Sequence, residues 1–226
     1  MTIKALLFDF DGLILDTETP EFGVWQAIYR EYGQHLTAET WGQIVGGLGA
    51  SQFDPAEHLV GLVGDGLAVE GLRARHKTES EALVLEQPIL PGVEEILNEA
   101  RQLSLRLAIA SSSPHSWVDA HLTRLGLFER FEAVICADDV PPGRTKPNPD
   151  LFLKAAEVLE ANTREALAFE DSPNGVRAAR AAGIFVVLVP NPMTALLEHD
   201  GADLALGSLA ELSLEELLSE VNRSSA

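Results

Sequence analysis

Two carboxylates separated by one residue follow the first apolar run of the chain. Residues 5–8 predict a strand buried on both faces, and Asp9-Phe10-Asp11-Gly12 comes directly after it. Alternate residues of a strand point the same way, so Asp9 and Asp11 would project together. Two negative charges at the end of a buried strand are unfavourable without a cation. The pair therefore indicates half of a metal site, or a nucleophile beside a general acid/base, against the alternative of an ordinary turn.

Polar side chains also follow three later apolar runs, each at the end of an expected strand. They are Ser111 after 105–110, Lys146 in the loop after 131–137, and Glu170 and Asp171 after 166–169. Ligands of an open parallel sheet bind beyond the carboxyl ends of its strands, so we expect these side chains to gather at one edge. Each has a simpler explanation as a helix cap or a solvated charge, as for Ser113-Pro114 and Ser172-Pro173 at expected helix starts. Their shared position favours a site.

The expected strands alternate with helical patterns, which predicts an α/β core whose parallel sheet is covered by helices on both faces. Further strands are expected at 184–189 and 202–205, and a last helix at 208–218. Residues 17–87 show no strand-like alternation and instead predict helices. We therefore expect a core formed by 1–16 and 88–226, with an inserted all-α domain at 17–87.

Composition limits the class of partner. The 226 residues carry a formal charge of -19, which argues against a nucleic acid or an anionic membrane. No signal peptide and no uninterrupted apolar stretch of about 18 residues is apparent, so a cytoplasmic protein is expected. The single Cys136 excludes an internal disulfide and is interpreted as a small core residue. The sequence does not decide the oligomeric state, for which we expect a monomer or a dimer.

Phosphoryl transfer suits this set of side chains. Carboxylates hold a hard cation such as Mg²⁺, and one carboxylate can then attack phosphorus to give an aspartyl phosphate. A second carboxyl group protonates the leaving oxygen and later accepts a proton from water. Ser111, Lys146 and the backbone amides near Ser113 would bind the remaining phosphate oxygens.

Four motifs resemble those of the haloacid dehalogenase superfamily, in its branch of phosphatases and β-phosphoglucomutase-like enzymes with a helical cap. They are Phe8-Asp9-Phe10-Asp11-Gly12, Ser111 after an apolar strand, Lys146-Pro147-Asn148-Pro149-Asp150, and Glu170-Asp171-Ser172-Pro173-Asn174-Gly175. Their order and spacing extend over the whole chain.

The resemblance implies a Rossmann-like core and a role for each motif. Asp9 would be the nucleophile and Asp11 the acid/base, which a dehalogenase would lack because halide leaves without a proton. Mg²⁺ would be held by Asp9, the backbone carbonyl of Asp11 and Asp171, with Glu170 in or next to the metal shell. Ser111, its neighbour Ser112 and Lys146 would bind phosphate.

The inserted domain would close over the site and select the substrate, for which the candidate residues are Glu21, Gly47, Arg75 and His76. A basic cluster at 72–77 is usually only the polar face of a helix, and the glycine-rich link at 46–51 is either a flexible connection or a substrate-sensing loop. Phosphoglucomutases carry a His where this chain has Glu21, and cations in the loop around Gly47 that this chain lacks. We therefore expect a Mg²⁺-dependent phosphatase of a small phosphorylated metabolite such as a sugar phosphate, with a phosphosugar mutase as the alternative.

Two other classes of protein use similar residues. A phospho-accepting receiver domain groups acidic residues and a Lys at strand ends, but it is much shorter and has no inserted cap. A capped protein that only binds a phosphorylated ligand would not need Asp9, Asp11, Lys146 and Asp171 together.

Overall fold

The computed structural model describes residues 2–45, 53–64 and 66–224. Its centre is a sheet of six parallel strands in the order β3-β2-β1-β4-β5-β6. The strands are β1 (Ala5–Phe8), β2 (Arg106–Ala110), β3 (Ala133–Ile135), β4 (Ala166–Glu170), β5 (Phe185–Leu188) and β6 (Leu204–Ala205). The predicted parallel sheet is therefore confirmed, and β1 lies in its middle, between β2 and β4.

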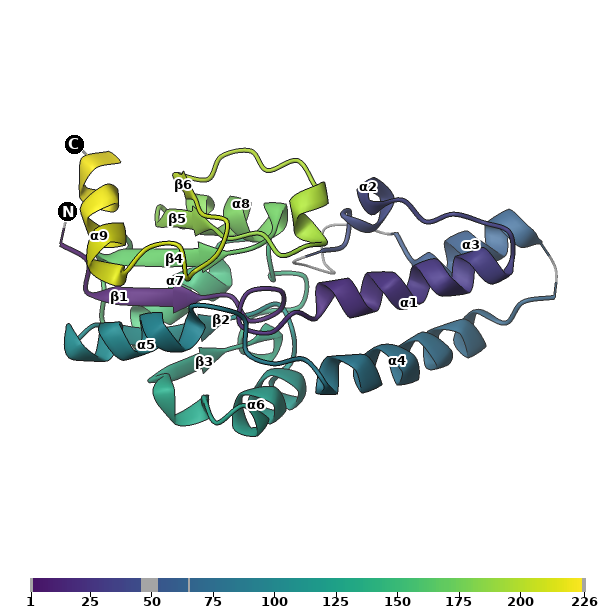
Figure 1. Cartoon of the computed structure of the whole chain (residues 1–226), viewed down its shortest axis with the longest axis horizontal. Coiled ribbons are helices and arrows are strands. Elements are labelled where there is room, and N and C mark those ends of the chain that lie inside the picture. The colour runs from purple at the N-terminus through teal and green to yellow at the C-terminus, as the bar shows by residue number, and fades with distance from the viewer. Residues whose placement is uncertain (1, 46–52, 65, 225–226) are drawn as a thin grey trace.

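Helices cover both faces of the sheet (Figure 1). On one face, α5 (Val93–Gln102), α6 (His115–Arg124) and α9 (Leu214–Ser224) share an apolar core with Leu6 and Phe8 of β1. On the other, α7 (Asp150–Val158) and α8 (Pro173–Ala181) pack on Ala5 and Leu7. Successive residues of β1 thus face opposite layers, which explains why the whole run is apolar. This is the expected Rossmann-like α/β arrangement.

The segment between β1 and α5 forms the inserted cap. It contains α1 (Glu18–Glu31), α2 (Ala38–Trp41), α3 (Pro55–Val63) and α4 (Val69–Leu85). The long helices α1 and α4 lie side by side and extend away from the sheet (Figure 1). The cap has its own apolar core, built around Trp25, Ile28 and Leu59, which the core-domain side chain Met193 joins. Because this core is separate from those of the sheet, we propose 17–87 as the domain boundaries.

A tight loop joins β1 to the cap. Gly12 has φ +80° and its amide donates to the Leu15 carbonyl at 2.7 Å. Leu13, Ile14 and Leu15 are buried in the same apolar cluster as α5, so the loop is anchored to the core domain. The chain can therefore turn out of the sheet immediately after Asp11.

The start of the last helix and the position of Cys136 can be compared with the sequence expectations. The last helix begins at Leu214, not near Ser208, because Ser213 and Glu216 cap it: the Ser213 amide donates to the Glu216 carboxylate at 2.9 Å. Cys136 is fully buried in the core, as expected. In the part of the chain that the structure describes, no helix combines the length and apolar character needed to cross a bilayer.

Candidate active site

Four buried ionisable side chains meet at the carboxyl ends of β1 and β4. Asp9 follows β1, Glu170 ends β4 with Asp171 next to it, and Lys146 comes from the loop before α7. The Lys146 ammonium lies 2.5 Å from Asp9 Oδ1 and 2.5 Å from Glu170 Oε1. All four side chains are nearly inaccessible to solvent, with Asp9 the most exposed at 3%. The structure therefore brings together residues that lie more than 130 positions apart in sequence.

One cation faces three carboxylates in this cluster, so the negative charge is not fully compensated. Burial raises the pKa of Asp9 to about 8, the Glu170 carboxylate adds to the rise, and Lys146 opposes it. Burial likewise raises the pKa of Asp171 well above its usual value, with Asp9 and Glu170 contributing. Burial lowers the pKa of Lys146, but the Asp9 and Glu170 carboxylates outweigh it and the net pKa is raised, so the amine stays charged.

The acidic residues of the cluster fit a hard divalent cation. Carboxylate oxygens of Asp9, Glu170 and Asp171 lie within 4.8 Å of one another. Oxygen-only donors are typical of Mg²⁺ and Ca²⁺ sites, and a divalent ion would supply the charge that the cluster lacks. The resemblance noted in the sequence implies the same set: Asp9 and Asp171 with the backbone carbonyl of Asp11, and Glu170 in or next to the metal shell.

Two glycines allow the carboxylates to approach the backbone. A Cβ at Gly12 would lie 2.2 Å from Asp171 Oδ2, and one at Gly175 in α8 would lie 1.9 Å from the Glu170 carboxylate. The Asn191 amide donates to Asp171 Oδ2 at 2.7 Å and to the Gly12 carbonyl at 3.2 Å. These contacts fix the direction of the Asp171 side chain.

Asp11 is held on the opposite side of the site by three donors. The Ser113 hydroxyl donates to Asp11 Oδ2 at 2.6 Å and the Ser111 hydroxyl donates to the same oxygen at 3.2 Å. The indole N–H of Trp117 donates to Asp11 Oδ1 at 2.8 Å. Asp11 is therefore bonded to side chains at the start of α6 and Asp9 is paired with Lys146, so the two carboxylates have different surroundings. Separate environments suit separate roles as acid/base and nucleophile.

The start of α6 differs from the expectation that Ser113 caps it. The N-cap position is Pro114, and the Asp138 carboxylate accepts from the His115 amide at 2.7 Å. The Ser113 hydroxyl is already used by Asp11, so an acid from another segment performs the capping. At α8 the expected cap is confirmed, since the Ser172 hydroxyl accepts from the Gly175 amide at 3.1 Å.

The phosphate-binding candidates lie around this pair of acids. Ser111 follows β2, is fully buried, and accepts from the Ser113 amide at 3.0 Å in addition to its bond to Asp11. Ser112 is half-buried and faces the cavity between core and cap. Lys146 is the cation nearest to Asp9.

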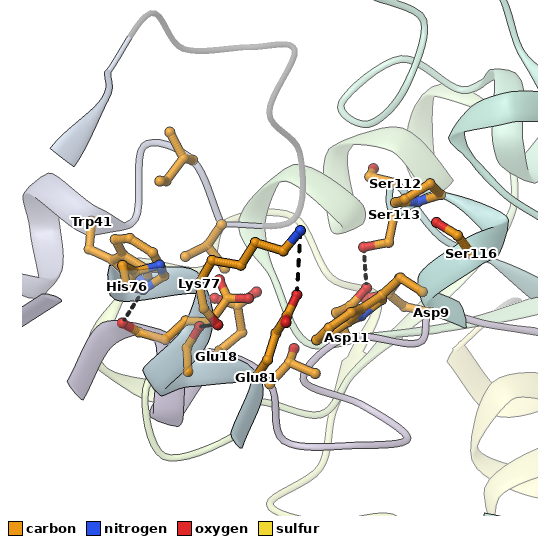
Figure 2. Close-up of a pocket in the computed structure, with 17 residues that line it drawn as sticks. Asp9, Asp11, Glu18, Trp41, His76, Lys77, Glu81, Ser112, Ser113 and Ser116 are labelled. Atoms are coloured by element: carbon orange, nitrogen blue, oxygen red, sulfur yellow. Dashed lines mark hydrogen bonds and ion pairs between the residues drawn. The ribbon is translucent and has the colours of Figure 1, made fainter. Parts of the chain in front are cut away.

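A cavity of about 540 Å³ separates the cap from the acids of the core (Figure 2). The cap side chains that line it come mainly from α1 and α4. The lining residues are Asp9, Asp11, Thr17, Glu18, Glu21, Trp41, Ile44, Val45, His76, Lys77, Ser80, Glu81, Ser112, Ser113, Pro114, Ser116 and Trp117.

Two of the four cap candidates reach this cavity. Glu21 and His76 line it, and His76 Nε2 donates to the Glu21 carbonyl at 3.0 Å. Arg75 is not among the described lining residues. It forms an ion pair at 2.6 Å with Glu31, which joins α4 to α1, and one at 2.7 Å with Glu79 of its own helix. Gly47 lies outside the described residues.

Sequence reasoning did not single out Asn191, Trp117 or Glu18. Asn191 comes three residues after β5, so the strand-end rule could have found it. Trp117 lies within the first turn of α6, and Glu18 is the first residue of α1. Nothing in the local pattern of Trp117 and Glu18 distinguishes them from core or surface positions, because their contacts are made with segments that are distant in sequence.

Comparisons with known proteins agree with this geometry. Residues 3–183 match the haloacid dehalogenase-like hydrolase family. The chain is 44% identical to "Putative phosphatase YhcW" of Bacillus subtilis (strain 168), over 97% of this chain and 98% of that one. It is 27% identical to a beta-phosphoglucomutase of the same organism, over 96% and 95%.

A solved structure shares the fold. It is a HAD family hydrolase from Deinococcus radiodurans R1 with bound phosphate and sodium, which is 27% identical, has a TM-score of 0.72, and matches 99% of this chain and 96% of that one. The order of the four motifs, the acids at the ends of β1 and β4, and these matches lead to one conclusion: the chain belongs to the haloacid dehalogenase-like hydrolase family.

Proposed function

We propose that this hydrolase is a Mg²⁺-dependent phosphatase that cleaves a small phosphorylated metabolite, such as a sugar phosphate, through a phosphorylated Asp9. The observation that carries the proposal is the buried cluster in which Lys146 bridges Asp9 and Glu170 beside Asp171. Its excess negative charge suits a divalent cation and, next to it, a phosphate group. The family and the relative described as a phosphatase support a phosphoric monoester hydrolase.

The proposed first step uses Asp9 and Asp11. An Asp9 carboxylate oxygen forms a bond to phosphorus while the bond from phosphorus to the ester oxygen breaks, and protonated Asp11 gives its proton to that oxygen. Trp117 and Ser113 hold Asp11 in place for this transfer. In the second step Asp11 accepts a proton from water as the water oxygen attacks phosphorus, which releases phosphate and restores Asp9.

Other groups of the chain bind the charge that is transferred. Asp9, Glu170 and Asp171, with the Asp11 carbonyl, would hold Mg²⁺, which supplies Lewis-acid stabilisation of the phosphoryl oxygens. Lys146 keeps Asp9 oriented and places a positive charge beside the phosphoryl group. Ser111 and Ser112 would contact the non-transferring oxygens.

The cap favours hydrolysis over mutase chemistry. A mutase must hold a sugar bisphosphate at both of its phosphates while the sugar reorients. In this chain Arg75 is engaged with Glu31 and Glu79, and the position of the mutase His is occupied by Glu21, which lines the cavity. A second phosphate would therefore meet an acid at the position where a mutase carries a His.

The test is a phosphate-release screen with purified protein and Mg²⁺ across sugar phosphates, glycerol phosphates, phosphoglycolate and nucleotides, with isomerisation of glucose 1-phosphate measured in parallel. We expect the wild-type protein to release phosphate from at least one sugar or polyol phosphate. The Asp9→Asn variant should release none from the same esters. Isomerisation that outpaces phosphate release would establish the mutase instead.

A further inference from the structure

The cap wall of the cavity is acidic. Glu18 and Glu21 come from α1 and Glu81 from α4, and Glu18 and Glu81 extend into the space between cap and core in Figure 2. They lie across the cavity from Asp9 and Asp11, so the part of the substrate that leaves would be surrounded by carboxyl groups. Such groups accept hydrogen bonds from hydroxyl and amine donors.

Little positive charge balances these acids. Lys77 is the one Lys or Arg among the described residues that line the cavity, and its ammonium lies 3.8 Å from Glu81 Oε1. Burial lowers the pKa of His76, so its ring is neutral at pH 7. Residues 46–52, whose placement is not described, contain no Lys or Arg in the sequence.

The shortage of positive charge is reflected in the raised pKa values of Glu18 and Glu21. Burial, as the largest cause, together with the charges of Asp11 and Glu81 raises the pKa of Glu21 to about 8. The pKa of Glu18 is raised for the same reason, with Glu21 and Asp11 adding to the effect of burial. A second anionic group on the substrate would add another negative charge to this set.

One buried hydroxyl in the cavity has no partner. Thr17 Oγ1 makes no hydrogen bond within the described residues, although the side chain is only 2% exposed and lines the same cavity. An unsatisfied buried hydroxyl costs free energy, and a polar ligand group would satisfy it. The indole rings of Trp41 and Trp117 line the same space and offer an apolar surface for the carbon skeleton.

We propose that the substrate is a monophosphate ester whose leaving group bears hydroxyl or amine donors and no second anionic group. Glu18 and Glu21 accept hydrogen bonds from those donors, Thr17 completes the polar contacts, and the acidic wall excludes bisphosphates and phosphorylated carboxylic acids. This inference rests on the proposed phosphatase activity and narrows its substrate class.

The test compares pairs of esters that differ in the second charge, at pH 9, which lies above the raised pKa of Glu21. Glycerol 3-phosphate is compared with 3-phosphoglycerate, and 2-aminoethyl phosphate with 2-phosphoglycolate, so the hydroxyl and amine classes are tested separately. We expect kcat/KM to be higher by about tenfold or more for the member without the carboxylate, as expected for charges several ångströms apart in a partly buried site. Equal values, or a preference for the carboxylate member in both pairs, would overturn the inference.

Charge-removing variants identify the wall as the cause. At pH 9, where Glu21 with its pKa of about 8 is mostly ionised, Glu21→Gln should reduce the ratio of kcat/KM within each pair by about tenfold, since one of the repelling charges is gone. Glu31→Gln removes the same charge from the same helix, but Glu31 pairs with Arg75 away from the cavity, so the ratio should not change. If Glu21→Gln does not fold, Glu81→Gln carries the same expectation. An unchanged ratio in the cavity variant would refute the assignment.

Failure of the two proposals can be told apart. If the wild-type protein with Mg²⁺ releases no phosphate from any of these esters or from p-nitrophenyl phosphate, the proposed function is wrong and this inference fails with it. If p-nitrophenyl phosphate is hydrolysed and the pairs are not discriminated, the phosphatase stands and only the substrate class is refuted.

Discussion

Replacement of Asp9 by Asn should abolish turnover and yet make the metal-free protein more stable. Asp9 is buried beside Glu170, and its pKa is raised from 3.8 to about 8. A carboxyl group whose folded pKa lies above its unfolded value destabilises the folded state as pH rises through that interval. The native protein therefore carries a cost at Asp9 that Asn, which has a similar shape and no charge, would remove.

The size of this effect follows from the shift. At about 1.4 kcal/mol per pKa unit, the rise from 3.8 to about 8 sets an upper limit of about 6 kcal/mol at pH 8. Water penetration and relaxation reduce such values, and Lys146 loses one of its two partners, so we expect a gain of about 2 kcal/mol. For a chain of this size that corresponds to a rise in Tm of about 5 °C.

The assay is thermal unfolding in EDTA between pH 5 and pH 8, alongside phosphate release with Mg²⁺. The advantage of Asp9→Asn should grow with pH across this window, because the cost at Asp9 is absent below pH 4 and complete near pH 8. Asp200→Asn, at an exposed position, is the matched control and should show no such trend. A variant that is less stable than wild type at pH 8, or whose advantage does not depend on pH, would refute this description of the site.

Four other changes test separate parts of the site. Trp117→Phe removes the indole donor to Asp11, and steady-state kinetics should show kcat falling about tenfold for alkyl phosphates and less for p-nitrophenyl phosphate, whose leaving group needs no proton. Gly175→Ala places a Cβ 1.9 Å from the Glu170 carboxylate and should weaken Mg²⁺ binding. A titration of activity with Mg²⁺ should then show that a higher Mg²⁺ concentration is needed for half-maximal activity. Arg75→Met should lower the urea concentration at the midpoint of unfolding only slightly and should not raise KM, because its ion pairs are on the surface and outside the cavity. EDTA should stop phosphate release, Mg²⁺ should restore it, and Ca²⁺, which prefers more ligands, should restore it poorly.

Much of the core could be predicted from the sequence because its signals are local. The apolar run at Ala5–Phe8 has no polar face, which is the pattern of a strand buried between two helical layers, and the structure places it in the middle of the sheet. The position of Asp9, Lys146 and Glu170 followed from one rule, that parallel strands present their carboxyl ends at the same edge.

The contacts between cap and core could not be predicted in this way. Arg75 and His76 are adjacent in a basic stretch of α4, and only the packing of α4 on α1 shows that His76 lines the cavity while Arg75 joins Glu31. Trp117 likewise gave no sequence signal, because its indole N–H finds Asp11 only when α6 is placed beside the end of β1. Which side chains of a helix line the cavity depends on the element that packs against that helix, and a single sequence does not reveal this packing.

The central claim is that Asp9 carries the phosphoryl group during turnover. The most direct measurement is rapid acid quench of the protein with Mg²⁺ and a hydrolysed ester, followed by borohydride reduction and mass spectrometry of the peptide that contains residues 5–12. We predict reduction of an acyl phosphate at Asp9 to homoserine, and none at Asp11. Steady turnover with no trapped product at Asp9, or trapping at another residue, would contradict the mechanism.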